Sequence, residues 1–163
     1  MEEGTIKKYQ EFITIINNGI DYFLSYLNPD IDIPKLKGEI NNDLNVSLLL
    51  TPGKQWKDLA KLSGSFKPGV YIIFGKENGK EDSYAIYIGK SNHVIKRLRE
   101  HAGNGEYKMR NFRLDFISCI IPVSKSNPKD ELHFLIPALE LSLIFYVQPR
   151  GIKILNKHGR LQE

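Results

Sequence analysis

Residues 69–101 constrain the fold of this chain more than any other stretch, because their pattern changes from that of strands to that of a helix. The runs 70–74 and 83–88 are rich in Val, Ile, Tyr and Phe, which predicts two β-strands. Between them, Asn78-Gly79 tolerates the positive φ of a hairpin turn. The stretch therefore predicts a β-hairpin that leads directly into a helix.

The helix after the hairpin carries two side chains that packing does not require. Gly89 ends the second strand, and Ser91 or Asn92 can cap the helix. At the spacing i, i+3, i+4 and i+7, one face of the helix holds Val94, Arg97, Leu98 and His101. A guanidinium and an imidazole one turn apart on an apolar face indicate a functional site. Each alone has an ordinary explanation, as a solvated cation or a satisfied helix-end histidine.

The first third of the chain contains no chemical motif. Residues 5–27 place apolar side chains at helical spacing, and Asn17-Asn18-Gly19 allows two shorter helices instead of one. Residues 29–54 are predicted to be a loop with a short strand at 46–50. Trp56 is expected to anchor this extension rather than to stack on a base.

The C-terminal half adds a third strand and a second long helix. The run 114–123 is apolar on both faces and contains Pro122 near its end, so we expect a well-covered strand. Residues 130–146 predict a helix interrupted at Pro137, where a second helix can begin. Glu140 is the only acid in the apolar run after Pro137, and burying a carboxylate without a partner is costly. It is therefore expected to be paired or to bind a metal ion.

Composition excludes several classes of protein. With 163 residues the chain is long enough for one domain with a sizeable core. No stretch approaches the length of a membrane span, and the acidic start Met1-Glu2-Glu3 is unlike a signal peptide. The single cysteine, Cys119, excludes an internal disulfide and indicates a buried thiol in a reducing compartment. We therefore expect a cytoplasmic protein that does not enter a membrane.

Positive charge is concentrated in the hairpin helix and the segment after it. The net charge is +4, but residues 90–113 hold seven basic and two acidic side chains, a net of +5. Residues 1–33 hold two basic and six acidic side chains, a net of −4. A basic stripe is typical of a nucleic-acid binder, although a solvated surface can have the same composition. The candidates for substrate contacts along the stripe are Lys90, Ser91, Lys96, Arg99, Lys108 and Arg110.

Taken together, these features resemble the GIY-YIG nuclease superfamily. The resemblance covers residues 68–157 and rests on an ordered set: Gly69-Val70-Tyr71, Tyr87-Ile88-Gly89-Lys90-Ser91, Arg97-Leu98, His101, Glu140, Pro149 and Asn156. Two departures are the sixteen-residue separation of Tyr71 from Tyr87, which a longer hairpin loop absorbs, and Val70 in place of the usual Ile. Members of the superfamily include homing endonucleases, the incision subunit of bacterial nucleotide-excision repair and some restriction enzymes.

The resemblance implies a small α/β (α+β) fold in which helices flank a three-stranded, mainly antiparallel sheet. Residues 67–163 would form the nuclease domain, and residues 1–66 an N-terminal helical extension or subdomain. The resemblance also implies a catalytic set, which consists of Tyr71, Tyr87, Arg97, His101, Glu140 and Asn156.

Each residue of that set has a role carried over from the family. Glu140 is the implied ligand of one Mg²⁺ (or Mn²⁺), and Arg97 the implied contact of the scissile phosphate. Tyr71 is the implied general base or water-positioning group, with the second tyrosine and the helical histidine completing its hydrogen-bond network. Asn156 is implied to orient Glu140 or a coordinated water.

The function expected from the sequence is Mg²⁺-dependent endonuclease cleavage of DNA, most simply of double-stranded DNA. In length the chain resembles small restriction enzymes. Two alternatives remain open. One is a non-catalytic nucleic-acid-binding module that keeps the fold; the other is a repair or mobile-element nuclease that acts on structured DNA. A sequence-specific cutter of both strands is expected to be a homodimer, since each site offers one metal ion for one strand.

Overall fold

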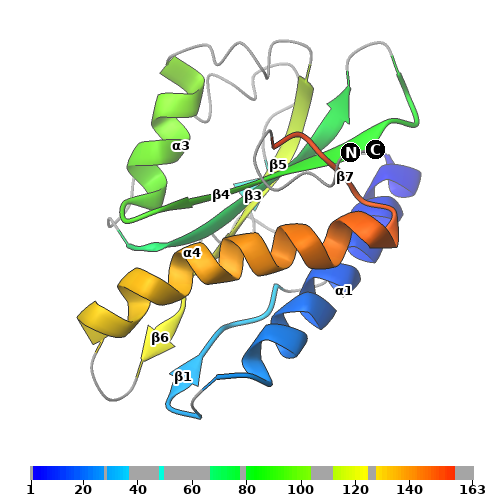
Figure 1. The fold of residues 1–163 in the computed structure, drawn as a ribbon. Coiled ribbons are helices and arrows are strands. Elements are labelled where there is room, and N and C mark those ends of the chain that lie inside the picture. Colours follow the sequence, from blue (N-terminus) through cyan, green and yellow to red (C-terminus); the bar gives the residue numbers. More distant parts are fainter. Residues whose placement is uncertain are drawn as a thin grey trace.

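In the computed structural model the chain is described over residues 2–27, 29–36, 48–49, 67–77, 80–103, 112–124 and 128–156. Within these ranges three α-helices surround a mixed sheet (Figure 1). The elements in chain order are α1 (Glu3–Leu24), β1 (Ile31–Asp32), β2 (Leu48–Leu49), β3 (Gly69–Glu77), β4 (Tyr84–Ser91), α3 (Val94–Gly103), β5 (Phe112–Ile120), β6 (Val123–Ser124), α4 (Pro128–Val147), the 3₁₀-helix η2 (Gln148–Arg150) and β7 (Lys153–Ile154).

The sheet is built around the hairpin predicted from the sequence. β3 and β4 are antiparallel neighbours, and β5 pairs antiparallel with the other side of β3, so that the strand order is β2-β5-β3-β4-β7. β7 instead pairs parallel to β4, through Ala85 and Ile86. The three-stranded antiparallel core is therefore confirmed, and two-residue strands extend it at both edges. A separate antiparallel pair joins β1 to β6.

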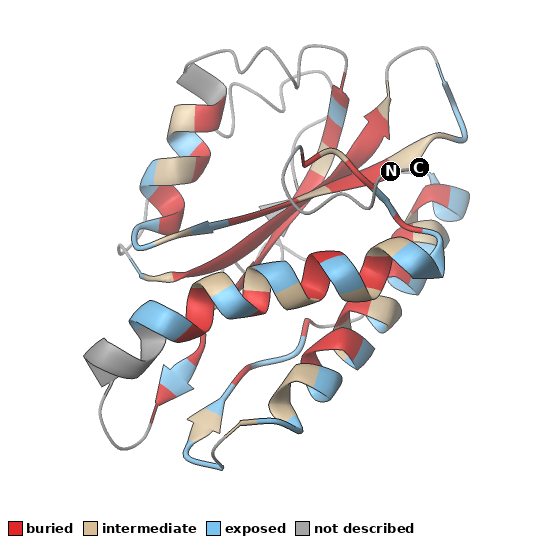
Figure 2. Cartoon of the chain, in the orientation of Figure 1, coloured by how far each residue is buried: buried red, intermediate tan, exposed pale blue. Residues whose placement is uncertain are grey.

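Helices cover both faces of this sheet (Figure 1). α3 lies on one face, and α1 and α4 pack against each other on the opposite face. Because side chains alternate along a strand, Tyr71 and Ile73 of β3 point to the α3 side, whereas Ile72 and Phe74 point towards α1 and α4. Figure 2 shows that buried residues gather on the strands between the two helical layers. The sheet thus separates two apolar cores.

α1 is one continuous helix, so the break allowed at residues 17–19 is absent. Gly19 lets α1 approach α4, because a Cβ at this position would lie 2.9 Å from the ring of Tyr146. The buried residues of α1 belong to the same core as those of β3, β4 and α4. The division of the chain into domains at residue 67 stays a prediction.

Tyr9 anchors α1 to the sheet through a partly buried hydrogen bond. Its hydroxyl donates to a carboxylate oxygen of Asp115 at 2.5 Å, and burial together with this bond raises the pKa of the phenol. The Asp115 side chain is only 10% exposed, so Tyr9→Phe leaves a nearly buried carboxylate without this donor. The free energy of unfolding should fall by about 1–3 kcal/mol. Urea unfolding measures the loss, with Tyr26→Phe, at an exposed tyrosine, as the control; equal effects of the two substitutions would contradict the anchor.

α4 runs without a break from Pro128 to Val147, with Pro137 inside it. The predicted interruption at Pro137 is therefore wrong. Proline removes one hydrogen bond from a helix interior. Here Ile136 and Leu139 are buried on either side of Pro137, and this tertiary packing outweighs the local penalty.

Cys119 is buried in β5, as the sequence predicts, and burial raises the pKa of its thiol to about 12. The thiol is therefore protonated, and so a poor nucleophile, at neutral pH. Residues 48 and 49 of the predicted strand 46–50 form β2, whereas Trp56 lies outside the described residues. None of the described helices combines the length and apolar character needed to span a bilayer.

Candidate active site

Two tyrosines and a histidine form a cluster between the hairpin and α3. Tyr71 and His101 are 1% and 0% exposed, and Tyr87 is half-buried beside them. The Tyr71 hydroxyl and Nε2 of His101 share a hydrogen bond of 2.6 Å. The rings of Tyr71 and Tyr87 are stacked with centroids 6.2 Å apart, and the imidazole meets them edge-on at 5.5 and 5.2 Å. This geometry allows a proton to pass between a phenol oxygen and an imidazole nitrogen.

The register of the hairpin explains why the two tyrosines meet. Tyr71 pairs with Gly89, and Ile73 pairs with Tyr87, across β3 and β4. Both phenols therefore leave the same face of the hairpin and point to the side that α3 covers. His101 follows one helical turn after Arg97, which places its ring on the face of α3 that packs onto the tyrosines.

The Tyr71 ring occupies the space that a side chain at position 89 would need, and glycine leaves this space free. A Cβ at Gly89 would lie 2.2 Å from Cζ and 2.3 Å from the hydroxyl oxygen of Tyr71. Real atoms cannot approach so closely without displacement of the ring or the strand. The glycine therefore allows the phenol to lie across β4 and reach His101.

Gly89→Ala should push the Tyr71 ring out of line with His101. We expect an overpacking cost of about 1–3 kcal/mol in the free energy of unfolding. Misplacement of a reacting group by about 1 Å can cost on the order of 10²-fold in rate, so the rate of the cleavage proposed below should fall at least about tenfold. Chemical unfolding and single-turnover kinetics measure the two effects. Gly4→Ala is the control, because nothing lies within 4 Å of a Cβ at Gly4; matching behaviour of the two variants would refute the packing argument.

Arg97 lies on the same face of α3, half-buried. Its Nη1 is 3.3 Å from Oε2 of Glu100, and the two side chains are 36% and 40% exposed. An ion pair this exposed contributes about 0–1 kcal/mol. A phosphate group can therefore replace Glu100 as the partner of this Nη1. Glu100 was not among the residues predicted for the site, although its i, i+3 spacing from Arg97 is readable in the sequence.

The predicted substrate contacts lie at the end of β4 and along α3. Ser91 Oγ accepts a hydrogen bond of 3.0 Å from the main-chain N–H of His93, so the hydroxyl fixes the turn that begins α3. Three of the predicted cations are exposed there, as contacts with a phosphate backbone require: Lys90, Lys96 and Arg99. Two lie outside the described residues: Lys108 and Arg110.

Asn156 fastens the C-terminal segment to β4. Its Oδ1 accepts a hydrogen bond of 2.9 Å from the main-chain N–H of Ile88, and its Nδ2 donates one of 2.5 Å to the carbonyl oxygen of Ile88. Since Ile88 lies between Tyr87 and Gly89, these bonds support the strand residues that carry the cluster. The contacts join Asn156 to the main chain of β4, and the implied orientation of Glu140 by Asn156 stays a prediction.

Glu140 comes from the other side of the sheet. It is half-buried on α4, in one i, i+4 row with the buried residues Ile136 and Ile144. α4 packs on the core to which Ile88 of β4 belongs, whereas Tyr87 packs on the opposite core. β4 therefore lies between the layer of Glu140 and the tyrosine cluster. A site that uses both must form at the edge of this strand, beyond the short pairing with β7.

The donor chemistry suits a metal ion held by a single protein carboxylate. Within the part of the chain that is described, no group of three or more His, Cys, Asp or Glu side chains could hold a metal ion. Glu140 offers a hard oxygen ligand, and Mg²⁺ in proteins commonly keeps several waters while it binds one or two carboxylates and a substrate phosphate. The Glu140 carboxylate is therefore compatible with Mg²⁺ as a ligand.

The fold and the cluster define a class of domain: an antiparallel hairpin that supplies two tyrosines, followed by a helix that supplies an arginine and a histidine. The model of the GIY-YIG catalytic domain family matches residues 67–147. The chain therefore belongs to the GIY-YIG nuclease superfamily. Comparison with curated proteins and with solved structures finds no match. Asn156 lies beyond the matched segment, which contains the other five residues of the predicted catalytic set.

Proposed function

We propose that the protein is a Mg²⁺-dependent endonuclease that hydrolyses phosphodiester bonds in double-stranded DNA. The observation that carries the proposal is the hydrogen bond of 2.6 Å between Tyr71 and His101, inside a domain of a nuclease superfamily. A buried phenol–imidazole pair, with an arginine on the helix face that carries the imidazole, is not required by packing, whereas hydrolysis of a phosphodiester can use such groups for proton transfer and charge stabilisation.

Tyr71 and His101 carry out the proton transfer. Tyr71 takes a proton from the attacking water as it passes its own hydroxyl proton to Nε2 of His101, 2.6 Å away. The stacked ring of Tyr87 holds the phenol in place, and Asn156 holds the strand beneath it through Ile88. The transfer therefore depends on groups that are fixed before the substrate arrives.

Arg97 and Glu140 act on the phosphate. The planar guanidinium can make two parallel hydrogen bonds to phosphate oxygens and offset the charge that develops in the transition state. Glu140 would hold Mg²⁺ at the edge of β4. When bound, Mg²⁺ supplies Lewis-acid polarisation of the phosphate and stabilises the leaving oxygen.

The exposed cations on β4 and α3 support a nucleic acid as the substrate. Lys90 at the end of β4, and Lys96 and Arg99 on α3, are exposed and would contact backbone phosphates. Such contacts release counterions, so binding should weaken steeply as salt is raised.

Supercoiled plasmid DNA tests the proposal. The protein should convert it to nicked or linear forms in the presence of Mg²⁺ or Mn²⁺, and EDTA should stop the reaction. A protein that retards the plasmid in a gel but leaves it supercoiled with either metal would be a binding module and not a nuclease.

A further inference from the structure

The most exposed large apolar side chains of the described residues come from elements on one side of the sheet. They are Tyr22, Tyr26, Val123, Phe134, Leu141 and Phe145. These residues belong to α1 and the turn after it, to β6 and to α4, on the face of the sheet away from α3 (Figures 1 and 2). Large exposed apolar patches mark sites of contact with another molecule.

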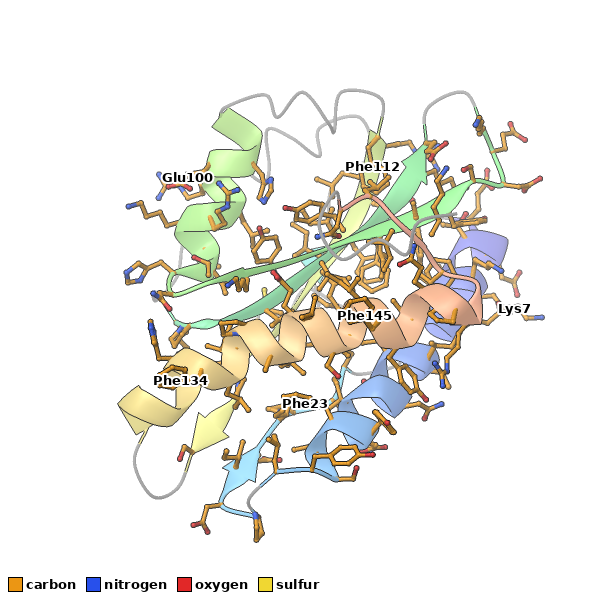
Figure 3. The ribbon with its side chains drawn as sticks, viewed as in Figure 1. Lys7, Phe23, Glu100, Phe112, Phe134 and Phe145 are labelled. Atoms are coloured by element: carbon orange, nitrogen blue, oxygen red, sulfur yellow. The ribbon has the colours of Figure 1, made fainter. Side chains whose placement is uncertain are left out.

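α4 carries the longest part of this surface as a straight stripe. Phe134, Ala138, Leu141 and Phe145 are all exposed, and their 4-3-4 spacing places them along one side of the helix. Phe134 and Phe145, both labelled in Figure 3, bound the stripe. Between residues 133 and 147 the only charged residue is Glu140, on the opposite flank. A solvated helix face normally carries charged side chains, so this face is suited to burial against a partner.

The stripe is complementary to itself when two copies run antiparallel. Reversal about its midpoint exchanges Phe134 with Phe145 and Ala138 with Leu141. In such a pair each small Ala138 faces the partner's larger Leu141, the alternation of small and large residues by which facing helices fill space. Contacts of this isologous kind are usual in homodimers. We infer that α4 forms the interface between two copies of this chain.

The end of α1 adds exposed aromatic side chains beside α4. Stable interfaces bury about 800 Å² per partner, and a stripe one side chain wide along a helix of 20 residues provides only part of that area. The exposed tyrosines of α1 lie beside α4: the Tyr22 ring centroid is 5.8 Å from that of Tyr146, and the ring centroids of Tyr22 and Tyr26 are 5.3 Å apart. Aromatic residues such as these are enriched in protein interfaces.

The pairing keeps the two candidate active sites apart. In each copy α4 and the Tyr71–His101 pair lie on opposite faces of the sheet, so the two pairs would face outward in opposite directions. Each copy would then act on its own DNA segment, in contrast to a dimer that closes around one duplex. The interface does not depend on the proposed nuclease activity, and its loss should leave the cleavage rate per chain unchanged.

Sedimentation equilibrium tests the interface. The wild-type mass should be twice the 18.7 kDa of one chain, and a monomer at the highest soluble concentration would overturn the inference. Leu141→Glu places a carboxylate of each copy near the two-fold axis and should raise the dissociation constant at least about a hundredfold. Thr14→Glu is the matched control and should stay dimeric. Thr14 is exposed on the side of α1 where Asn17 and Asp21 bind the segment 31–36, away from α4.

A double variant separates loss of the interface from misfolding. Ala138→Lys combined with Leu141→Glu in one chain places the introduced lysine of each copy opposite the introduced glutamate of the other. This variant should dimerise again, and more weakly at high salt. A Leu141→Glu variant that remains a dimer, or a folded double variant that remains a monomer, would overturn the antiparallel pairing.

Discussion

Tyr71→Phe should reduce the rate of DNA cleavage by about 10²–10⁴-fold, the usual contribution of a positioned proton-transfer group. The substitution removes the oxygen that bonds to His101 at 2.6 Å. It keeps the ring that lies over Gly89 and stacks on Tyr87, so the fold and the DNA affinity should change little. Single-turnover cleavage of a plasmid measures the rate, and fluorescence anisotropy with a labelled duplex measures binding.

Tyr22→Phe is the matched control for this experiment. Tyr22 is an exposed tyrosine on the other side of the sheet, and its hydroxyl contacts that of Tyr26. Its loss should leave the cleavage rate unchanged. A Tyr71→Phe enzyme within tenfold of the wild-type rate, a difference of only about 1.4 kcal/mol, would mean that the Tyr71 oxygen takes no part in proton transfer.

Glu140→Gln should abolish metal-dependent cleavage while DNA binding survives. The amide keeps the size of the side chain but removes the charge proposed to bind Mg²⁺, and the action of that ion on a phosphate is worth several kcal/mol. A rate loss of at least about 10³-fold is therefore expected. Cleavage measured against Mg²⁺ concentration and calorimetric titration with Mn²⁺ report activity and metal affinity separately.

The control for Glu140 is Glu81→Gln, an exposed acid between β3 and β4. It removes the same charge from a site that the proposal does not use, and both activity and metal affinity should be retained. Full cleavage by Glu140→Gln would remove the metal assignment. Lost cleavage with unchanged Mn²⁺ affinity would place the ion on other ligands.

The hairpin and α3 could be predicted from the sequence because their signals are local. The runs 70–74 and 83–88 lie almost wholly within β3 and β4, and the spacing of Arg97 and His101 matches the observed helix. The continuity of α1 and α4 could not be predicted in this way. Both helices pack on each other and on the core beneath the sheet, and such tertiary packing is not visible in local sequence patterns.

The strand β7 could not be predicted from the sequence for a different reason. A two-residue strand has no periodicity to detect, and its parallel pairing with β4 joins distant parts of the chain. The contacts of Asn156 with Ile88, 68 positions earlier, belong to the same long-range arrangement. Such pairings become visible only once the order of strands is known.

For the site too, features that depend on neighbouring residues could be predicted from the sequence, whereas features that depend on distant parts of the chain could not. The resemblance implied that Tyr71, Tyr87 and His101 act together, and the structure gathers them in one cluster, although their catalytic roles stay predictions. The packing reason for Gly89 depends on where a distant ring lies. Because Glu140 is an isolated acid in an apolar helix, the sequence indicates that it is partly buried. The sequence does not indicate which face of the sheet this helix covers.

A crystal structure of the Tyr71→Phe variant with duplex DNA and Mn²⁺ tests the central claim most directly, because the anomalous signal of Mn²⁺ locates the ion without assumptions about its ligands. The account predicts one Mn²⁺ at the Glu140 carboxylate, with a DNA phosphate that also contacts Arg97. An ion bound elsewhere, with Glu140 directed away from Arg97 and residue 71, would contradict it.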